Sequence, residues 1–275
     1  DGCAAISAGH DGTLRVWNVT TGEMTRVVAG ISATNRHAIA FDPTHRLLAY
    51  GTLKHTVVLE DVVTTQPVFE LNVGEAEPDL VAFDPSGRWL AVGSNDGAVL
   101  VYRLGSESRP TAPVYAIPPT GAPVWRLLFS PDSAMLASIR TDQSLQLLDL
   151  TTGAVTATLA TYFGAFCLAF SRDGAQMVTD GPDHSLLLRD TRTCAVDHVL
   201  SGHRAAVTCI EVSPRDNRIA SSSVDGSIRL WELASGACTA TLEVQDPYAG
   251  MTVTDVRGIT LAQRESLLHL GARLA

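Results

Sequence analysis

Six short segments of the chain share one pattern, and this pattern decides the fold. They read LRVWNV (14–19), VVLEDV (57–62), VLVYRL (99–104), LQLLDL (145–150), LLLRDT (186–191) and IRLWEL (228–233). Their fourth residues are Trp17, Glu60, Tyr102, Leu148, Arg189 and Trp231, and these are separated by 43, 42, 46, 41 and 42 residues. A recurring period of this size indicates an internal structural repeat.

Each of the last five segments follows two further strand-like runs that are joined by a polar turn, as in LVAFDPSGRWLAVGS (80–94). Asp-Gly pairs at 11–12, 96–97 and 225–226 then predict tight hairpin turns. A third turn, such as TTG (151–153), leads to a fourth run. The repeated unit is therefore predicted to be four short antiparallel strands, which we name a, b, c and d in chain order.

Many of these strands are apolar on consecutive residues, as at Leu186, Leu187 and Leu188. This pattern is typical of a sheet that is covered on both faces. Sheets that stack around a common axis cover one another in this way, which is the arrangement of a β-propeller. The sequence thus predicts an all-β propeller with six four-stranded blade units, of which the first lacks strand a.

The predicted propeller domain covers residues 1–258. Its blade units are placed at about 1–30, 31–72, 73–118, 119–160, 161–200 and 201–243. The segment 250–256, which contains the β-branched run MTVTDV, is predicted to fill the missing inner place of the first blade and close a six-bladed ring. In the alternative, the chain is a piece of a longer propeller whose missing strand lies upstream. The two alternatives are compatible.

The period, the paired Trp-polar ends and the dipeptide Gly202–His203 resemble WD40 repeats over about residues 1–243. The resemblance implies a buried structural network of His203, Ser221, Asp225 and Trp231 in the last unit, with Asp11 and Trp17 kept in the first. The middle units depart from the pattern, because Glu60, Tyr102, Leu148 and Arg189 replace Trp. We expect those blades to depend more on apolar packing.

The tail, residues 248–272, resembles the ending of bacterial WD40 proteins fused to NACHT- or NB-ARC-type NTPases of the STAND class. Thr260 and Gln263 form a capping-box pattern, and a short C-terminal helix is predicted within 259–275, ending near Gly271. The resemblance implies that the propeller is the C-terminal sensor of a larger signalling or defence NTPase, with further domains upstream.

Composition narrows the possible functions. The formal net charge of −9 argues against binding along a nucleic-acid backbone, which needs a basic excess. The sequence contains no run of about 20 apolar residues, so no membrane span is predicted. The five cysteines form no CxxC pair, which favours reduced thiols and a cytoplasmic location. No P-loop, HExxH, GxSxG or zinc-ligand spacing is present, so no cofactor, metal or enzymatic activity is expected.

In propellers of this family the d–a and b–c loops share one face, which commonly binds partners. Aromatic and arginine side chains are the residues that most often dominate such interfaces. The predicted partner-binding residues on this face, for a protein or peptide, are Trp125, Arg126, Arg140, Tyr162, Phe163 and Phe166. In the alternative, these rings pack beneath long loops as additional core.

The alternative function is that of a propeller enzyme, since some propellers hold a hydrolase or lyase site at the central channel. Such a site needs acids or histidines that converge from several strands a. His37 and Asp79 are the hint of one in this sequence.

Overall fold

The computed structural model describes residues 4–9, 11–31, 38–105, 110, 112–162, 167–213, 215–216 and 218–243. These residues form six antiparallel sheets, which we number blade 1 to blade 6. Blade 1 has three strands, and each of the other five has four. This confirms the all-β fold and the absence of strand a from the first unit of the described chain.

The strands follow one another in space as they do in the sequence. Blade 1 contains β1 (Ala4–Ala8), β2 (Thr13–Asn18) and β3 (Met24–Ala29), and blade 2 contains β4 (Ile39–Phe41), β5 (Leu47–Gly51), β6 (Thr56–Asp61) and β7 (Gln66–Asn72). Blade 3 contains β8 (Pro78–Phe83), β9 (Trp89–Ser94), β10 (Val99–Arg103) and β11 (Tyr115–Ile117), and blade 4 contains β12 (Val124–Phe129), β13 (Met135–Arg140), β14 (Ser144–Asp149) and β15 (Val155–Ala160). Blade 5 contains β16 (Leu168–Phe170), β17 (Gln176–Asp180), β18 (Leu186–Asp190) and β19 (Val196–Leu200), and blade 6 contains β20 (Val207–Val212), β21 (Arg218–Ser223), β22 (Ser227–Glu232) and β23 (Cys238–Glu243). One 3-10 turn, η1 (Pro182–His184), joins strands b and c of blade 5.

The turns between strands b and c use one backbone conformation throughout. The predicted Asp-Gly turns place Gly12, Gly97 and Gly226 at φ of 71°, 91° and 79°. The same position in blades 2, 4 and 5 carries His55, Gln143 and His184, with φ of 57°, 68° and 61°. Glycine adopts this left-handed conformation without a steric penalty, whereas other residues do so at a small cost.

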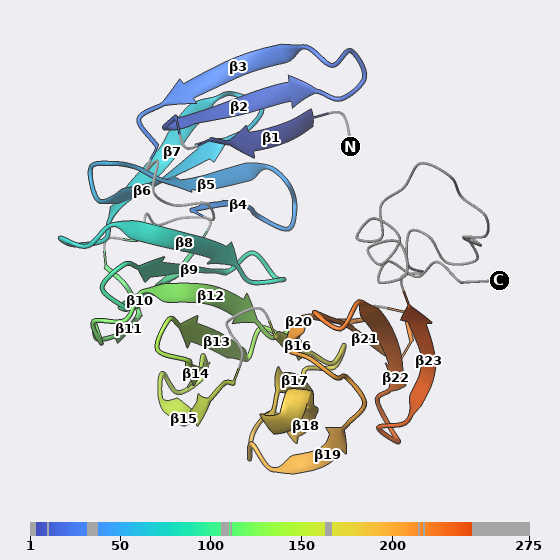
Figure 1. Cartoon of the computed structure of the whole chain (residues 1–275). Helices are drawn as coiled ribbons and strands as arrows, with labels where there is room; N and C mark the ends of the chain where they lie inside the picture. The colour runs from blue at the N-terminus through green and yellow to red at the C-terminus, as the bar shows by residue number, and fades with distance from the viewer. Residues whose placement is uncertain are drawn as a thin grey trace, which may run out of the picture.

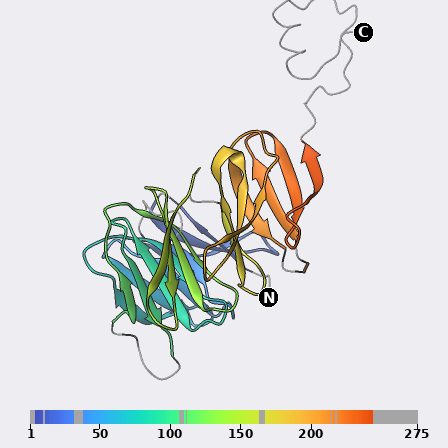
Figure 2. The same cartoon turned by 90° about the horizontal axis from the view of Figure 1, so that it is seen from below.

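The six blades stand side by side along an arc that begins with β1–β3 and ends with β20–β23 (Figures 1 and 2). At three of the junctions the first strands of neighbouring four-stranded blades contact one another, with β8 against both β4 and β12, and β16 against β20. Strand a of each blade therefore lies on the inner side of the arc, and strand d lies outermost.

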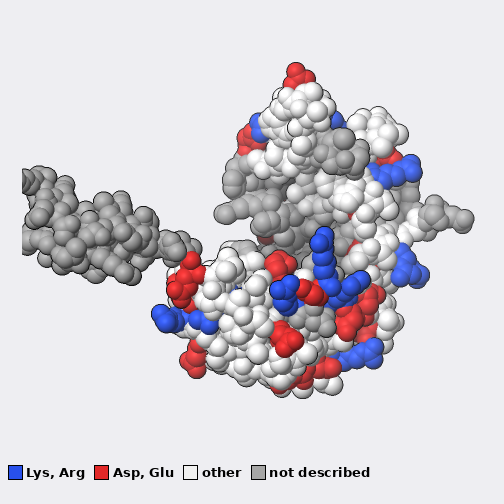
Figure 3. Space-filling view, turned by 90° about the vertical axis from the view of Figure 1, so that its right-hand side faces the viewer, with Lys and Arg blue, Asp and Glu red and all other residues white. Residues whose placement is uncertain are grey.

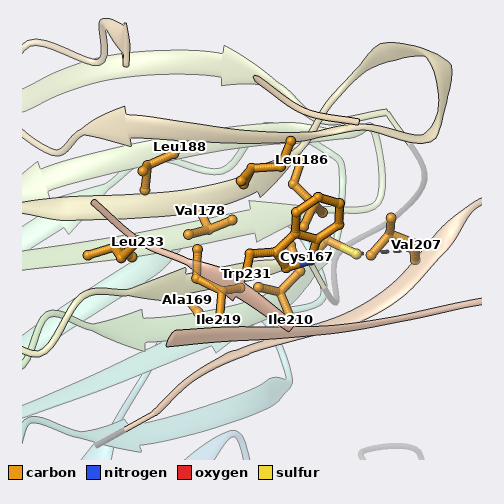
Figure 4. Packing of buried hydrophobic residues seen from close by; sticks show 11 residues of the cluster. Cys167, Ala169, Val178, Leu186, Leu188, Val207, Ile210, Ile219, Trp231 and Leu233 are labelled. Carbon is orange, nitrogen blue, oxygen red and sulfur yellow. Dashed lines mark hydrogen bonds between the residues drawn. The ribbon is translucent and has the colours of Figure 1, made fainter. Parts of the chain in front are cut away.

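The hydrophobic core is divided into five clusters, and each lies between two neighbouring blades. The cluster between blades 2 and 3 includes Val57 and Leu59 on one side and Val92 on the other. The remaining clusters join blades 1 and 2, 3 and 4, 4 and 5, and 5 and 6. Figure 4 shows the last of these, with Trp231 lying among side chains of both blades. No cluster among the described residues joins blade 6 to blade 1.

Burial confirms that the consecutive apolar residues have covered neighbours on both faces. Leu186, Leu187 and Leu188 are at most 7% exposed. The predicted closing strand at 250–256 and the predicted helix within 259–275 lie outside the described residues. In the part of the chain that is described, no helix is long and apolar enough to cross a bilayer.

Truncating a side chain between two blades should destabilise the protein strongly. Leu59 is fully buried between blades 2 and 3, so Leu59→Ala removes apolar contacts and leaves a cavity. We expect the free energy of unfolding in urea to fall by about 2–5 kcal/mol. Val63→Ala, at a turn residue that is 83% exposed, is the control, for which a change within about 0.5 kcal/mol is expected. Equal effects of the two substitutions would contradict a core located between the blades.

Candidate functional site

The b–c turns and the d–a segments lie together at one end of the blades. In blade 4 the amide of Thr141 donates to the carbonyl oxygen of Pro123 at 3.0 Å, and the amide of Thr161 donates to Gln143 at 2.8 Å. In blade 6 the amide of Val224 donates to Ala206 at 3.0 Å. We call this end of the molecule the loop face, and it carries the residues predicted to bind a partner.

Two of the predicted aromatic side chains are accessible on the loop face. Trp125 is 46% exposed and lies at a β-bulge, where the register between β12 and β13 shifts between Val124 and Arg126. Tyr162 is 44% exposed, and its amide donates to Oδ2 of the buried Asp180 at 2.8 Å. The loop backbone that carries Tyr162 is therefore tied to blade 5. Phe163 and Phe166 lie outside the described residues.

Arg140 occupies a different environment from the two rings. It ends β13, it is 1% exposed, and its Nε donates to the carbonyl oxygen of Gly97 in the neighbouring blade 3 at 3.1 Å. Nη1 lies 3.5 Å from Oγ of Ser138, and Nη2 has no hydrogen-bond partner among the described residues. Burial lowers the pKa of the Arg140 guanidinium, and the carboxylate of Asp142 opposes this effect. The side chain thus connects two blades beneath the surface instead of contributing exposed area.

Arg126 and Asp180 place charges next to a buried thiol. Burial raises the pKa of Cys167 to about 12, the negative charge of Asp180 adds to this rise, and Arg126 opposes it. Sγ of Cys167 lies 3.1 Å from the carbonyl oxygen of Val207. Because the thiolate is the reactive form of cysteine, a thiol with so high a pKa is inert at neutral pH.

The four residues of the predicted network in blade 6 are joined by hydrogen bonds. Nδ1 of His203 lies 3.1 Å from Oδ2 of Asp225, and Nε2 lies 2.8 Å from Oγ of Ser221. Nε1 of Trp231 donates to the same Ser221 oxygen at 2.8 Å. His203, Ser221 and Trp231 are at most 6% exposed. A His–Asp–Ser arrangement can suggest a nucleophile, but here the serine oxygen is enclosed and accepts from Trp231, which favours a structural role.

Asp225 remains ionised in this network. Burial raises its pKa, but hydrogen bonds from the Ser227 hydroxyl, from the amides of Arg204 and Ser227, and from His203 outweigh burial and hold the pKa well below the usual range. The network therefore ties the d–a segment that precedes blade 6 to the b–c turn of the same blade.

In blades 1 and 2, the residues equivalent to this network make different contacts. In blade 1, Nε1 of Trp17 donates to Oγ of Ser7 at 2.8 Å, while Asp11 pairs with Arg15. In blade 2, the 3%-exposed Glu60 accepts two hydrogen bonds from Arg26 of blade 1. Blade 2 packs between apolar clusters on both sides, and at this position an ion pair between blades takes the place of the tryptophan.

A small cavity of about 220 Å³ lies on the inner side of the arc, between β12, β16 and β20. Its lining is mainly apolar, with Arg126 and Glu211 as the charged residues. No three His, Cys, Asp or Glu side chains within the described residues lie close enough together to hold a metal ion. Of the two residues that hinted at a channel site, Asp79 lies in β8, and His37 is outside the described residues.

The sequence interpretation missed a group of aspartates at the opposite end of blades 4 and 5. Asp132, Asp149, Asp173 and Asp190 line one cleft there. The signal that could have found them is their repetition, since blades 4 and 5 each carry an acid in the a–b turn and another as the fifth residue of the strand c segment.

The architecture defines a protein of the β-propeller class, built from repeated four-stranded units. The WD domain, G-beta repeat model matches residues 80–103 and 195–232. The chain is 33% identical to the WD repeat-containing protein SL1-17 of Schistosoma mansoni, over 85% of this chain and 76% of that protein. The chain therefore belongs to the WD-repeat family, as its repeat pattern predicted.

Two further relatives cover different shares of the chain. The ribosome biogenesis protein YTM1 of Pyricularia oryzae is 26% identical over 95% of this chain and 62% of its own length. The target of rapamycin complex subunit LST8 of Saccharomyces cerevisiae is 36% identical over 38% of this chain and 35% of its own length. The chain thus spans less than two thirds of both of these relatives.

Removing the shared acceptor of the blade 6 network should destabilise the protein. Ser221→Ala leaves His203 Nε2 and Trp231 Nε1 buried without the oxygen that both contact. We expect the free energy of unfolding to fall by about 1–3 kcal/mol. Ser222→Ala, which affects a contact with the exposed Thr208, is the matched control and should cost less than about 0.5 kcal/mol. Similar losses for both serines would contradict a special role for the network.

Substitutions of Arg140 should distinguish its charge from its packing. Arg140→Met keeps the length of the side chain and removes a buried charge that forms no salt bridge with a described carboxylate, so the melting temperature should stay the same or rise. Arg140→Glu places an acid in the same enclosed space, and its melting temperature should fall by several degrees, since about 1 kcal/mol shifts it by about 2–4 °C in a chain of this size. A large loss with Arg140→Met would mean that a buried anion pairs with the guanidinium.

Proposed function

We propose that the chain is a non-enzymatic protein-interaction module, which holds a protein partner or peptide on the loop face around Trp125 and Tyr162. The observation that carries this proposal is the exposure of two aromatic rings, 46% and 44%, on segments that a rigid scaffold fixes in place. Exposed aromatics on ordered loops are typical centres of binding energy in protein interfaces. The name of the relative LST8 as a subunit of a complex supports a role in assembly.

Arg126 belongs to the same proposed surface. It is half-buried next to Trp125 on β12 and also lines the cavity on the inner side of the arc, so it would extend the proposed surface toward that cavity. Arg140 acts in this proposal from beneath, by fixing the b–c turn of blade 4 against Gly97. The two arginines therefore have different roles, one in contact with the partner and one in support of the surface.

The proposal extends to the larger protein in which this propeller would act. The resemblance of residues 248–272 to STAND proteins supports a cytoplasmic sensor at the C-terminal end of a larger bacterial NTPase, in signalling or defence. The relatives described above are eukaryotic, and none is named as an NTPase. Sequencing the reading frame upstream of Asp1 tests this, since a sensor of this kind requires a P-loop domain in the same polypeptide.

Trp125→Ala should weaken partner binding without loss of stability, because the ring is largely exposed. We expect the affinity to fall at least about tenfold, which corresponds to about 1.4 kcal/mol for one contact residue. Affinity capture with quantitative mass spectrometry would compare the wild type, Trp125→Ala and Tyr162→Ala, followed by titration of the captured partner.

The control is Val196→Ala, at an exposed position at the start of β19, next to the c–d turn at the other end of the blade. Loss of one and the same partner with both aromatic variants, and its retention by the control, is the expected result. A drop in melting temperature for Trp125→Ala would instead assign the ring to the core, and unchanged capture by both aromatic variants would rule out the loop face.

A further inference from the structure

The acidic cleft between blades 4 and 5 lies opposite the loop face. It is formed by the a–b and c–d turns of the two blades and has a volume of about 430 Å³, within the range of about 300–1,000 Å³ that is usual for ligand sites. Four carboxylates line it: Asp132 and Asp149 from blade 4, and Asp173 and Asp190 from blade 5.

A close approach between the two blades places the a–b turn of blade 5 against Asp132 of blade 4. Gly174, in the a–b turn of blade 5, has φ of 73°, and a Cβ atom there would lie 3.0 Å from the carboxyl carbon of Asp132. Any larger residue would therefore push the Asp132 side chain away from blade 5. The glycine is required both by the turn conformation and by this contact.

Each of the four aspartates uses one oxygen for its own turn and leaves the other free. Oδ1 of Asp149 accepts from the amides of Thr151 and Thr152 at 2.7 and 3.0 Å, and Oδ1 of Asp190 accepts from the amide of Thr193 at 2.7 Å. Oδ1 of Asp132 and of Asp173 accept in the same way within their own turns. Oδ2 of all four makes no hydrogen bond within the described part of the chain.

The turn hydrogen bonds also keep the cleft negatively charged. The Thr151 hydroxyl lowers the pKa of Asp149, the Ser171 hydroxyl lowers that of Asp173, and the Thr193 amide lowers that of Asp190. These three groups therefore stay ionised well below neutral pH.

Within the described residues the cleft has one nearby cation, Arg192, whose charge helps to lower the pKa of Asp190. None of the four aspartates forms a salt bridge with a described Lys, Arg or His, although the exposed Arg192 lines the same cleft. In blades 2 and 3 the residue equivalent to Asp149 and Asp190 adds no unbalanced negative charge. Asp61 of blade 2 forms a salt bridge with Arg46, and blade 3 has Arg103 at this position. On the face in Figure 3, acidic and basic side chains lie intermingled.

A buried hydroxyl in the cleft wall is a second, independent sign of a ligand. Thr191 lines the cleft and is 1% exposed, yet its Oγ1 has no hydrogen-bond partner among the described residues. A buried polar atom without a partner is costly, and such atoms in native structures usually indicate a missing water, ion or ligand. The oxygen can accept a hydrogen bond from an N–H donor.

We propose that this cleft is a second binding site, which takes an arginine or lysine side chain from a basic peptide segment of a protein partner. The free Oδ2 atoms and the Thr191 hydroxyl are all acceptors, and an ammonium or guanidinium group supplies donors alone. A metal ion does not fit, because no three acidic side chains converge closely enough to hold one. This site is separate from the loop face and does not depend on the function proposed for that face.

The test titrates fluorescently labelled hexa-arginine, hexa-lysine and hexa-glutamate peptides against the whole chain and follows anisotropy at low and high salt. The wild type should bind both basic peptides, and binding should weaken as salt rises, since the interacting charges are partly exposed. The double variant Asp149→Asn with Asp190→Asn keeps acceptor oxygens for the turns, and it should bind at least about tenfold more weakly.

The matched control is Asp142→Asn with Asp183→Asn, which removes the same charge from the b–c turns of the same two blades. It should change the affinity less than about twofold, since those turns lie at the other end of the sheets.

Backbone amide NMR signals of Thr151, Ala175 and Arg192 should move when hexa-arginine is added to the wild type. Equal loss in both double variants, or signals that move at the loop face instead, would overturn the proposal. So would tight binding of spermidine that displaces the peptides, which would make the cleft a polyamine site.

Discussion

The structure depends on one requirement, which is that each sheet must be covered on both faces. The strands are apolar on consecutive residues, so neither face of an inner blade can remain in water. Each core cluster accordingly lies between two blades. The two end faces are the exception within the described residues. Leu242 in blade 6 is 57% exposed, whereas the equivalent Leu200 in blade 5 is 1% exposed, because no described neighbour covers that face of blade 6.

The same requirement explains why the fourth residue of the strand c segment can vary so widely. Trp231, Glu60 and Leu148 occupy equivalent positions, and all three are at most 3% exposed. Trp231 donates a hydrogen bond to Ser221, Glu60 accepts hydrogen bonds from Arg26 of the preceding blade, and Leu148 packs in the apolar cluster between blades 3 and 4. These three residues share enclosure by a neighbouring blade, and the chemistry that satisfies it differs from blade to blade.

This difference separates what the sequence could predict from what it could not. The period, the strands and the Asp-Gly turns are local signals, because alternation and turn conformation are set by adjacent residues. The pairing of Arg26 with Glu60 joins residues 34 apart on separate blades, and it depends on the packing of one sheet against the next. No local pattern contains that information, so the buried glutamate could not be given a partner in advance.

In the candidate site, too, some features could be predicted from the sequence and others could not. The repeat pattern placed Trp125 at the loop face, and the ring is accessible there because a β-bulge interrupts the pairing beside it. Arg140 was placed near the same face by its turn, but its long side chain reaches Gly97 of blade 3 and becomes buried. A backbone position can be inferred from a repeat, whereas the direction and burial of a long side chain depend on the neighbouring blade.

Variation in charge is concentrated where the repeat leaves side chains outside the cores. The residue after the enclosed position is Asn18, Asp61, Arg103, Asp149, Asp190 or Glu232 in successive blades. Because these residues lie beside turns, their substitution costs little packing energy. Each junction between blades therefore combines a similar apolar interior with its own set of charges at the end. The junction of blades 4 and 5 is distinctive because both blades contribute two acids and neither supplies a salt-bridge partner for them within the described residues, so recognition can change there without altering what holds the blades together.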